Sequence, residues 1–156
     1  MGLKERAAPQ LVCVLALLSA LSTPAWEKKM KLEQLPAAVR ETVVEASRGL
    51  KLRVVTREVK NGETFYEAEL EVDGHIRDVI IDANGAIVLV EEEVAWERLP
   101  AAVRAAIEKG AEGGKILHVE SLTRNDVIEA YEGHVRKWWR KIEIRVDPEG
   151  NPIEAK

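Results

Sequence analysis

The chain contains an internal repeat, which restricts its fold more than any other feature of the sequence. Residues 35–40, LPAAVR, return unchanged as residues 99–104. The offset is 64 residues at this hexamer and 65 between Tyr66 and Tyr131, so we place one inserted residue in the second copy, near Gly110 to Gly114. A sustained offset of this size indicates two copies of one supersecondary unit, each too small to bury much of its apolar face alone.

The N-terminus has the pattern of a secretory signal peptide. A basic start precedes an apolar run of 11 residues, 11–21. At 1.5 Å per residue this run covers about half of a hydrocarbon core roughly 30 Å thick, so it is too short for a membrane span. Small residues favour cleavage between Ala25 and Trp26. We therefore predict a signal peptide over residues 1–25 and no stable transmembrane segment after processing.

Composition restricts the compartment and the class of partner. The lone cysteine, Cys13, lies in the predicted signal, and a mature chain without cysteine fits a bacterial periplasm or exterior. Loss of Lys4, Glu5 and Arg6 changes the formal net charge from −4 to −5. An acidic chain with interspersed signs disfavours nucleic acid as a partner, because duplex binding needs a basic surface.

The first repeat, residues 26–94, is predicted to form a helix followed by four antiparallel strands. Pro36 suits the first helical position, and Gly49 suits the left-handed residue beyond the helix end. The turn pairs Asn61-Gly62 and Asp73-Gly74 favour tight hairpins, which leave no room for parallel crossovers. Tyr66, Ala68, Leu70 and Val72 alternate with glutamates, so that strand is expected to have one wet face. The predicted strands cover 51–60, 66–72, 75–82 and 87–90.

The second repeat, residues 95–156, is predicted to follow the same α+β plan. Its helix covers about 100–109, its strands cover 115–124, 127–137 and 140–146, and the fourth strand has shrunk to 151–153. We expect this last strand to be short or frayed. The apolar positions on the inner faces predict that the core includes Val39, Val43, Leu70, Ile80, Val103, Ile107, Ile142 and Ile144.

These features resemble the PepSY-like family, including its β-lactamase-inhibitor-like members. The resemblance rests on the LPxxV-type helix start, the second strand rich in Tyr and Glu, the hydrophilic hairpin and the closing D-x-x-G turn, and it covers about 35–90 and 99–153. It implies an exported protein in which each helix packs on an antiparallel sheet, with roles in binding or inhibiting other proteins. It supplies no catalytic residues.

The sequence offers little for catalysis or metal binding. The mature chain has only Ser47 and Ser121 as serines, and neither lies in a nucleophile-elbow sequence. His75, His118 and His134 show no ligand spacing with one another, and a half-buried strand histidine is the commoner reading. We therefore predict no enzyme activity, no metal and no cofactor.

The recurring acidic residues have structural explanations. Asp82 and Asp147 each suit a tight turn in which the carboxylate accepts from following backbone N–H groups. Glu67 and Glu132 recur on a strand whose outward neighbours are acidic, and are interpreted as a wet face. Residues 91–93, EEE, are interpreted as an edge and linker that resists unwanted strand pairing.

An aromatic and basic cluster is the sharpest candidate for a binding site. In continuous strand, one tryptophan would enter the core and the other would lie outside, whereas in a turn both would project. The plainer interpretation is that one indole fills the core and the other packs under the basic side chains. We expect unequal fates for the two indoles. The cluster consists of Arg136, Lys137, Trp138, Trp139, Arg140 and Lys141.

Two functional classes follow from these observations. The leading hypothesis is an exported, non-enzymatic binding module, inhibitor-like in character, that presents a sheet face or hairpin tips to another envelope or secreted protein. The alternative is a periplasmic small-ligand or envelope-stress sensor that uses a pocket between helix and sheet.

The first prediction concerns processing. We expect the exported protein to begin at or close to Trp26, because the apolar run is too short to span and small residues precede this position. Intact-mass analysis of the exported protein tests this. A soluble cytoplasmic protein that retains residues 1–25 would contradict it.

Overall fold

The structure, a computed structural model, describes residues 28–153. The predicted signal peptide and its cleavage point lie outside these residues. Within them, one eight-stranded antiparallel sheet runs in simple chain order. The strands are β1 (Lys28–Met30), β2 (Lys51–Lys60), β3 (Glu63–Val72), β4 (His75–Asp82), β5 (Ile87–Glu93), β6 (Lys115–Arg124), β7 (Val127–Lys137) and β8 (Arg140–Val146).

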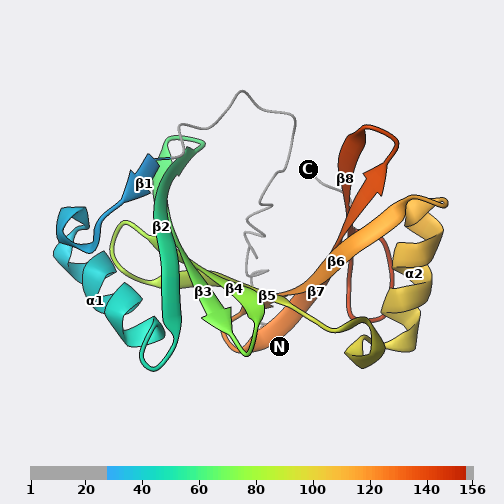
Figure 1. The fold of residues 1–156 in the computed structure, drawn as a ribbon, viewed down its shortest axis with the longest axis horizontal. Coiled ribbons are helices and arrows are strands. Elements are labelled where there is room, and N and C mark those ends of the chain that lie inside the picture. The colour runs from blue at the N-terminus through green and yellow to red at the C-terminus, as the bar shows by residue number, and fades with distance from the viewer. Residues whose placement is uncertain (1–27, 154–156) are drawn as a thin grey trace, which may run out of the picture.

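Two helices, α1 (Ala37–Ala46) and α2 (Ala101–Ala111), flank the sheet. A short 3₁₀ turn precedes each of them, at Leu32–Gln34 and Trp96–Arg98. The sheet is strongly bent, and both helices lie on its convex side, one against each repeat (Figure 1). The predicted α+β class and the helix-plus-strands repeat are confirmed. No described helix is long and apolar enough to cross a membrane.

Each helix packs on its own repeat through a separate apolar cluster. Val39 and Val43 of α1 are fully buried against β2, β3 and β4, and Val103 and Ile107 of α2 are fully buried against β6, β7 and β8. A third cluster lies on the opposite, concave face and joins the two repeats. It consists of Phe65, Ile80, Leu89, Leu122 and Ala130.

Six of the eight predicted core residues are buried. The exceptions, Ile142 and Ile144, are only half-buried. Both lie on β8, which pairs with β7 on one side and, within the described part of the chain, makes only an isolated bridge, Val146 to Pro152, on the other. An edge strand has fewer neighbours to cover it, so its inward residues keep some exposure.

The two repeats join through backbone pairing between β5 and β6. Val90 lies opposite Thr123, and Glu93 lies opposite Glu120. The interpretation of residues 91–93 as an edge that resists pairing is therefore wrong. Their carboxylates alternate between the two faces of the sheet, so Glu92 reaches Arg77 at 2.9 Å on the helix side while the backbone remains free to pair.

The pairing of β1 with β2 in the first repeat is equivalent to the pairing of β5 with β6 at the joint between the repeats. Lys28 lies opposite Arg57, and 64 residues later Glu92 lies opposite Ser121. The end of β5 is thus both the fourth strand of the first repeat and the entry strand of the second. In the second repeat the fourth strand is reduced to the single bridge at Pro152, as predicted.

The inserted residue of the second repeat lies in β7, not near Gly110 to Gly114. The 64-residue offset holds through β6, from Lys51 and Lys115 to the end of the strand. On β7, Thr123 lies opposite Ile128 while Leu122 lies opposite Ala130, which leaves Glu129 as an extra residue in a β-bulge. The flexible glycines misled the sequence interpretation, because insertions are commonest in loops.

The D-x-x-G turns recur and connect the sheet to the helices. The Asp82 carboxylate accepts from the N–H groups of Asn84 and Ala86 at 2.8 and 2.9 Å, which confirms the predicted turn role. Gly85 has a φ of +88° and lies against α1, where an added Cβ would come within 2.8 Å of the Ala38 carbonyl carbon. Gly150 is placed in the same way against α2.

The second prediction tests this contact with two glycine substitutions. Gly74→Ala, at a hairpin with φ +86° and open space, should cost about 1–2 kcal/mol of unfolding free energy from backbone strain alone. Gly85→Ala adds overpacking against α1 and should cost about 3 kcal/mol or more. Urea unfolding measures both. Equal losses would show that the turn does not position the helix.

Candidate functional site

The predicted aromatic and basic cluster forms the tip of the β7–β8 hairpin. Strand β7 ends at Lys137 and β8 begins at Arg140, so Trp138 and Trp139 are the two turn residues, at the upper right of Figure 1. Their exposed fractions are 81% and 84%. The expectation of unequal fates is wrong, because neither indole lies in a strand and neither enters the core. The turn alternative, in which both project, is confirmed.

Trp138 has a backbone conformation that bulky residues avoid. Its φ is 61°, in the left-handed region. The other described hairpin tips place small polar residues or glycine there: Asn61-Gly62, Asp73-Gly74 and Asn125-Asp126. For an ordinary L-residue this conformation costs about 1–2 kcal/mol. The two indoles meet edge to face, with ring centroids 5.9 Å apart, which offsets only part of that cost.

Cationic side chains flank the indoles on both strands. Arg136 lies opposite Lys141, and Lys137 lies opposite Arg140. Like charges directly opposite each other are unfavourable in a sheet. Lys137 forms an ion pair with Glu112 beyond the end of α2, whereas the other three are exposed and form no ion pair with a described residue. The tip therefore combines apolar surface with uncompensated positive charge at a cost to stability.

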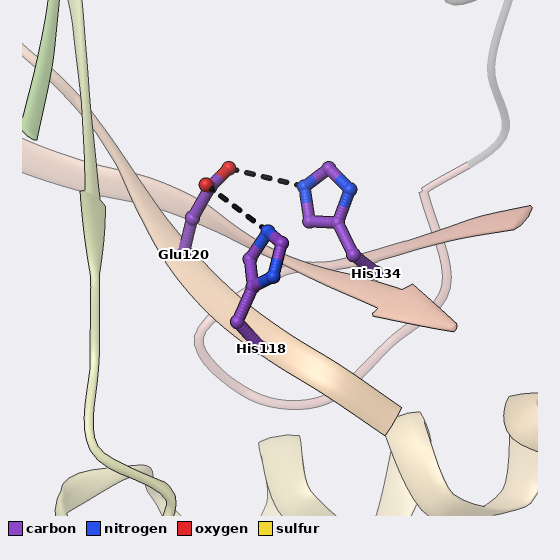
Figure 2. A group of neighbouring side chains, drawn as sticks. All are labelled: His118, Glu120 and His134. Atoms are coloured by element: carbon purple, nitrogen blue, oxygen red, sulfur yellow. Dashed lines mark hydrogen bonds and ion pairs between the residues drawn. The ribbon is translucent and has the colours of Figure 1, made fainter. Parts of the chain in front are cut away.

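A second group of polar side chains lies on the concave face of the sheet. The structure brings together His118 and Glu120 from β6 and His134 from β7 (Figure 2). One Glu120 oxygen lies 3.1 Å from His134 Nε2, and the other lies 3.4 Å from His118 Nε2. The two imidazole rings stack, with centroids 4.3 Å apart. The hydrogen bond to Glu120 raises the pKa of His134.

The bulge at Glu129 explains why the sequence analysis missed this group. An uninterrupted hairpin from the Asn125-Asp126 turn would place His134 opposite Leu117, on the other face from His118. With Glu129 as an extra residue, His134 instead lies directly opposite His118. The one available sequence signal was His118-x-Glu120, a spacing that places both residues on one face of a strand.

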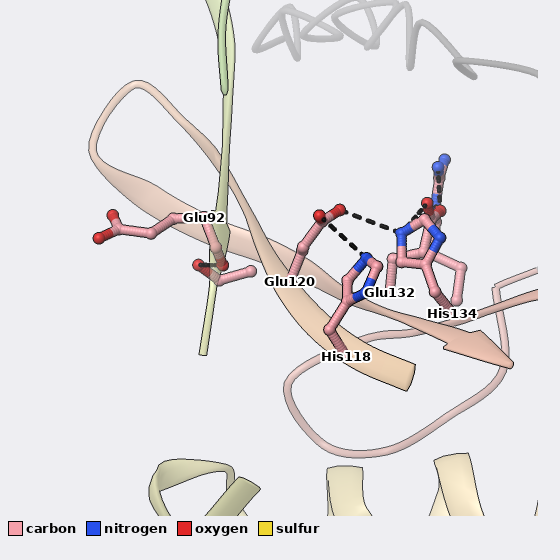
Figure 3. A network of polar contacts seen from close by, with 7 residues as sticks. Glu92, His118, Glu120, Glu132 and His134 are labelled. Atoms are coloured by element: carbon pink, nitrogen blue, oxygen red, sulfur yellow. Dashed lines mark hydrogen bonds and ion pairs between the residues drawn. The ribbon is translucent and has the colours of Figure 1, made fainter. Parts of the chain in front are cut away.

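Glu132 does not lie on a wet face. Its exposed fraction is 6%, and it accepts from Arg145 Nε at 2.7 Å. Arg145 lies directly opposite it on β8 and supplies the compensating charge. Figure 3 shows Glu120, His134 and Glu132 in one contact network, with Glu92 pointing away from them. The equivalent Glu67 is only half-buried.

Asp78, also on the concave face, has a strongly perturbed carboxyl group. Burial, together with the nearby carboxylates of Glu67, Glu69 and Glu91, raises its pKa from 3.8 to about 8. Its Oδ1 atom is buried and has no hydrogen-bond partner among the described residues. The concave face of the sheet therefore gathers several carboxyl groups, and Asp78 is held mostly in its protonated form near neutral pH.

A cleft of about 920 Å³ lies on the helix side of the sheet, lined by β4, β6, the 3₁₀ turn at Trp96–Arg98 and Glu108 of α2. Its central charged groups are already paired: Glu92 contacts Arg77 at 2.9 Å and His75 at 3.0 Å. A ligand here would have to displace these contacts or use the cleft's apolar walls.

The third prediction concerns pH. The folded state holds the Asp78 proton more tightly than the unfolded chain, so its contribution to stability is fully present below about pH 4 and is lost as the pH rises through about 8. Asp78→Asn should therefore raise the melting temperature by roughly 5 °C at pH 9 and change it little at pH 4. Thermal unfolding across this range measures the difference. Asp126→Asn, in an exposed turn, is the control. If the melting temperature of Asp78→Asn changed with pH in parallel with that of the wild type, the assignment would be contradicted.

No protein-family model and no curated protein matches the sequence. Solved structures do share the fold. A DUF2874 family protein from Bacteroides uniformis gives a TM-score of 0.61 at 19% identity, over 78% of this chain and 88% of its own. A Bacteroides eggerthii protein, described as a candidate periplasmic protein, gives 0.60 at 16% identity, over 77% and 86%. A BLIP-like protein from Bacteroides fragilis gives 0.56 at 21% identity, over 78% and 85%.

These likenesses cover most of both chains in each pair, and they extend across the two repeats. The chain therefore has the fold of these Bacteroides proteins, and its resemblance to PepSY-like, β-lactamase-inhibitor-like proteins is confirmed at the level of the fold.

Proposed function

We propose that this chain is an exported, non-enzymatic binding module that docks the β7–β8 tip onto another envelope or secreted protein. The observation that carries the proposal is the pair Trp138 and Trp139, both more than four-fifths exposed at a turn that would be more stable with other residues. Tryptophan and arginine are the residue types most enriched among binding hot spots. A costly, exposed pair of indoles is best explained by a use outside the folding of the chain.

The chemistry of the tip indicates the chemistry of its partner. Arg136, Arg140 and Lys141 surround the indoles with positive charge, so the complementary surface is an apolar pocket with a rim of carboxylates. Such a pocket would bury the indoles, while the rim charges would steer the approach. A two-residue tip on a narrow hairpin fits a recess better than a flat surface. Insertion into a recess is also how an inhibitor-like module would act.

Three further observations support export and binding over catalysis. The predicted signal peptide agrees with the description of the Bacteroides eggerthii protein, and the BLIP-like protein from Bacteroides fragilis shares the fold. Ser121 contacts the Glu92 backbone oxygen at 3.4 Å, and both concave-face histidines contact Glu120. Ser121 is therefore not paired with a histidine that could activate it as a nucleophile.

The cleft on the helix side is the feature that the alternative function, a small-ligand sensor, would use. Its volume is large enough for a small molecule. Native mass spectrometry of the protein purified from its own envelope distinguishes the two hypotheses. A small molecule retained in a one-to-one ratio favours the sensor, and a protein retained in that ratio favours the module.

The fourth prediction tests the tip directly. A photo-crosslinking phenylalanine analogue at position 139 should give one dominant protein adduct in the native envelope, and the same analogue at Asn61, the tip of the β2–β3 hairpin, should not. Charge reversal at Arg140 and Lys141 should remove the adduct. With the partner purified, Trp139→Ala should weaken binding by about 2 kcal/mol, roughly 30-fold, as for an interface anchor.

The control for this experiment is folding stability. Because both indoles are exposed, Trp138→Ala and Trp139→Ala should leave the melting temperature nearly unchanged. Equal adducts from positions 61 and 139, or a loss of stability that accounts for the loss of binding, would reject the tip as the docking site.

A further inference from the structure

The group formed by His118, Glu120 and His134 has the geometry of a metal site. One ligand atom from each residue lies within 4.8 Å of the other two. His134 Nε2 lies 3.1 Å from one Glu120 oxygen, and His118 Nε2 lies 3.4 Å from the other. A tetrahedral ion with ligands at about 2.0–2.1 Å requires its ligand atoms to be about 3.3 Å apart. Small side-chain rotations would therefore be enough to enclose an ion.

The donor set selects the class of ion. Two imidazole nitrogens and one carboxylate suit Zn²⁺ and other late first-row divalent ions, whereas Ca²⁺ and Mg²⁺ require several oxygen ligands. Three protein ligands also leave one position open for water or an external ligand. An open position of this kind is typical of sites where the bound ion exchanges a ligand or takes part in a reaction.

The backbone holds these ligands in place. His118 and Glu120 lie on β6, which pairs with β5 on one side and β7 on the other, and His134 lies on β7, which pairs with β6 and β8. Central strands of a sheet are rigid, so little ordering is needed when an ion binds. Beside the ligands, Glu132 is fixed by its ion pair with Arg145.

The first repeat lacks this site, although its strands pair in the same register. The structurally equivalent pair to His118 and His134 is Val54 and Glu69, and the equivalent of Glu120 is Thr56. The common fold therefore does not require this combination of side chains. Only the second repeat combines two imidazoles with a carboxylate.

We propose that the Nε2 atoms of His118 and His134 and the carboxylate of Glu120 bind one divalent transition-metal ion, with Zn²⁺ as the preferred ion. The site lies on the concave face, where the carboxyl groups of Glu91, Glu120 and Glu132 are close enough to interact electrostatically. It is independent of the β7–β8 tip. The competing explanation is that both imidazoles only donate hydrogen bonds to Glu120, in which case Zn²⁺ would not bind there.

The test is a Zn²⁺ titration of the untagged protein against a chromophoric chelator. We expect one Zn²⁺ per chain, and at least tenfold weaker binding in His118→Asn, His134→Asn and Glu120→Gln. The matched control is His75→Asn, which removes the third histidine, on the opposite face, and should bind Zn²⁺ as the wild type does. Trp139→Ala should also bind normally, which separates this proposal from the proposed function.

A second readout uses the unaltered chain and does not depend on how the variants fold. In histidine ¹⁵N spectra, Zn²⁺ should shift the Nε2 signals of His118 and His134 and leave those of His75 unchanged. Co²⁺ should give the visible absorption bands of a tetrahedral site. No saturable binding, equal binding by His118→Asn and His75→Asn, or equal shifts at all three histidines would overturn the proposal.

Discussion

The pairing of β5 with β6 is the interaction on which the rest of the structure depends. It turns two small units into one sheet of eight strands, and it does so with backbone hydrogen bonds that need no particular side chains. Three consecutive glutamates can therefore occupy the joint. The joint also places the concave faces of the repeats side by side, so that Leu89 of one repeat packs with Leu122 of the other. Without it, neither repeat would bury its concave apolar residues.

The two faces of this sheet have different roles. The helices cover the convex face, where apolar clusters supply most of the stability through burial. No helix among residues 28–153 covers the concave face, and there carboxylates and imidazoles gather around a smaller apolar centre. Burial without full compensation raises the pKa of Asp78. Such perturbed groups occur where a protein uses its surface for more than folding, and the histidines lie on this same face.

Local signals in the sequence predicted most of the fold. The repeated hexamer, the Asn61-Gly62 turn and the spacing of Val39 and Val43 each depend on near neighbours, and all were interpreted correctly. The features that were missed depend on register. A single extra residue, Glu129, decides which face His134 occupies, and no local propensity marks a bulge of this kind. The predicted strands 127–137 and 140–146 have the observed bounds and already leave Trp138 and Trp139 as the turn. The expectation of unequal fates was wrong because it did not follow that placement, in which both side chains project.

The shortened segment at Asn151 to Ile153 has a consequence for how such repeats can be arranged. In this architecture the last strand of one unit is also the first contact of the next, as β5 is for β6. At the C-terminal side that strand is reduced to one bridge, and Pro152 has no N–H to offer. A third unit built on the same plan would therefore find no complete strand there to share. The loss of a few residues thus removes the strand through which a further unit would join, and among the described residues it leaves β8 as the edge of the sheet.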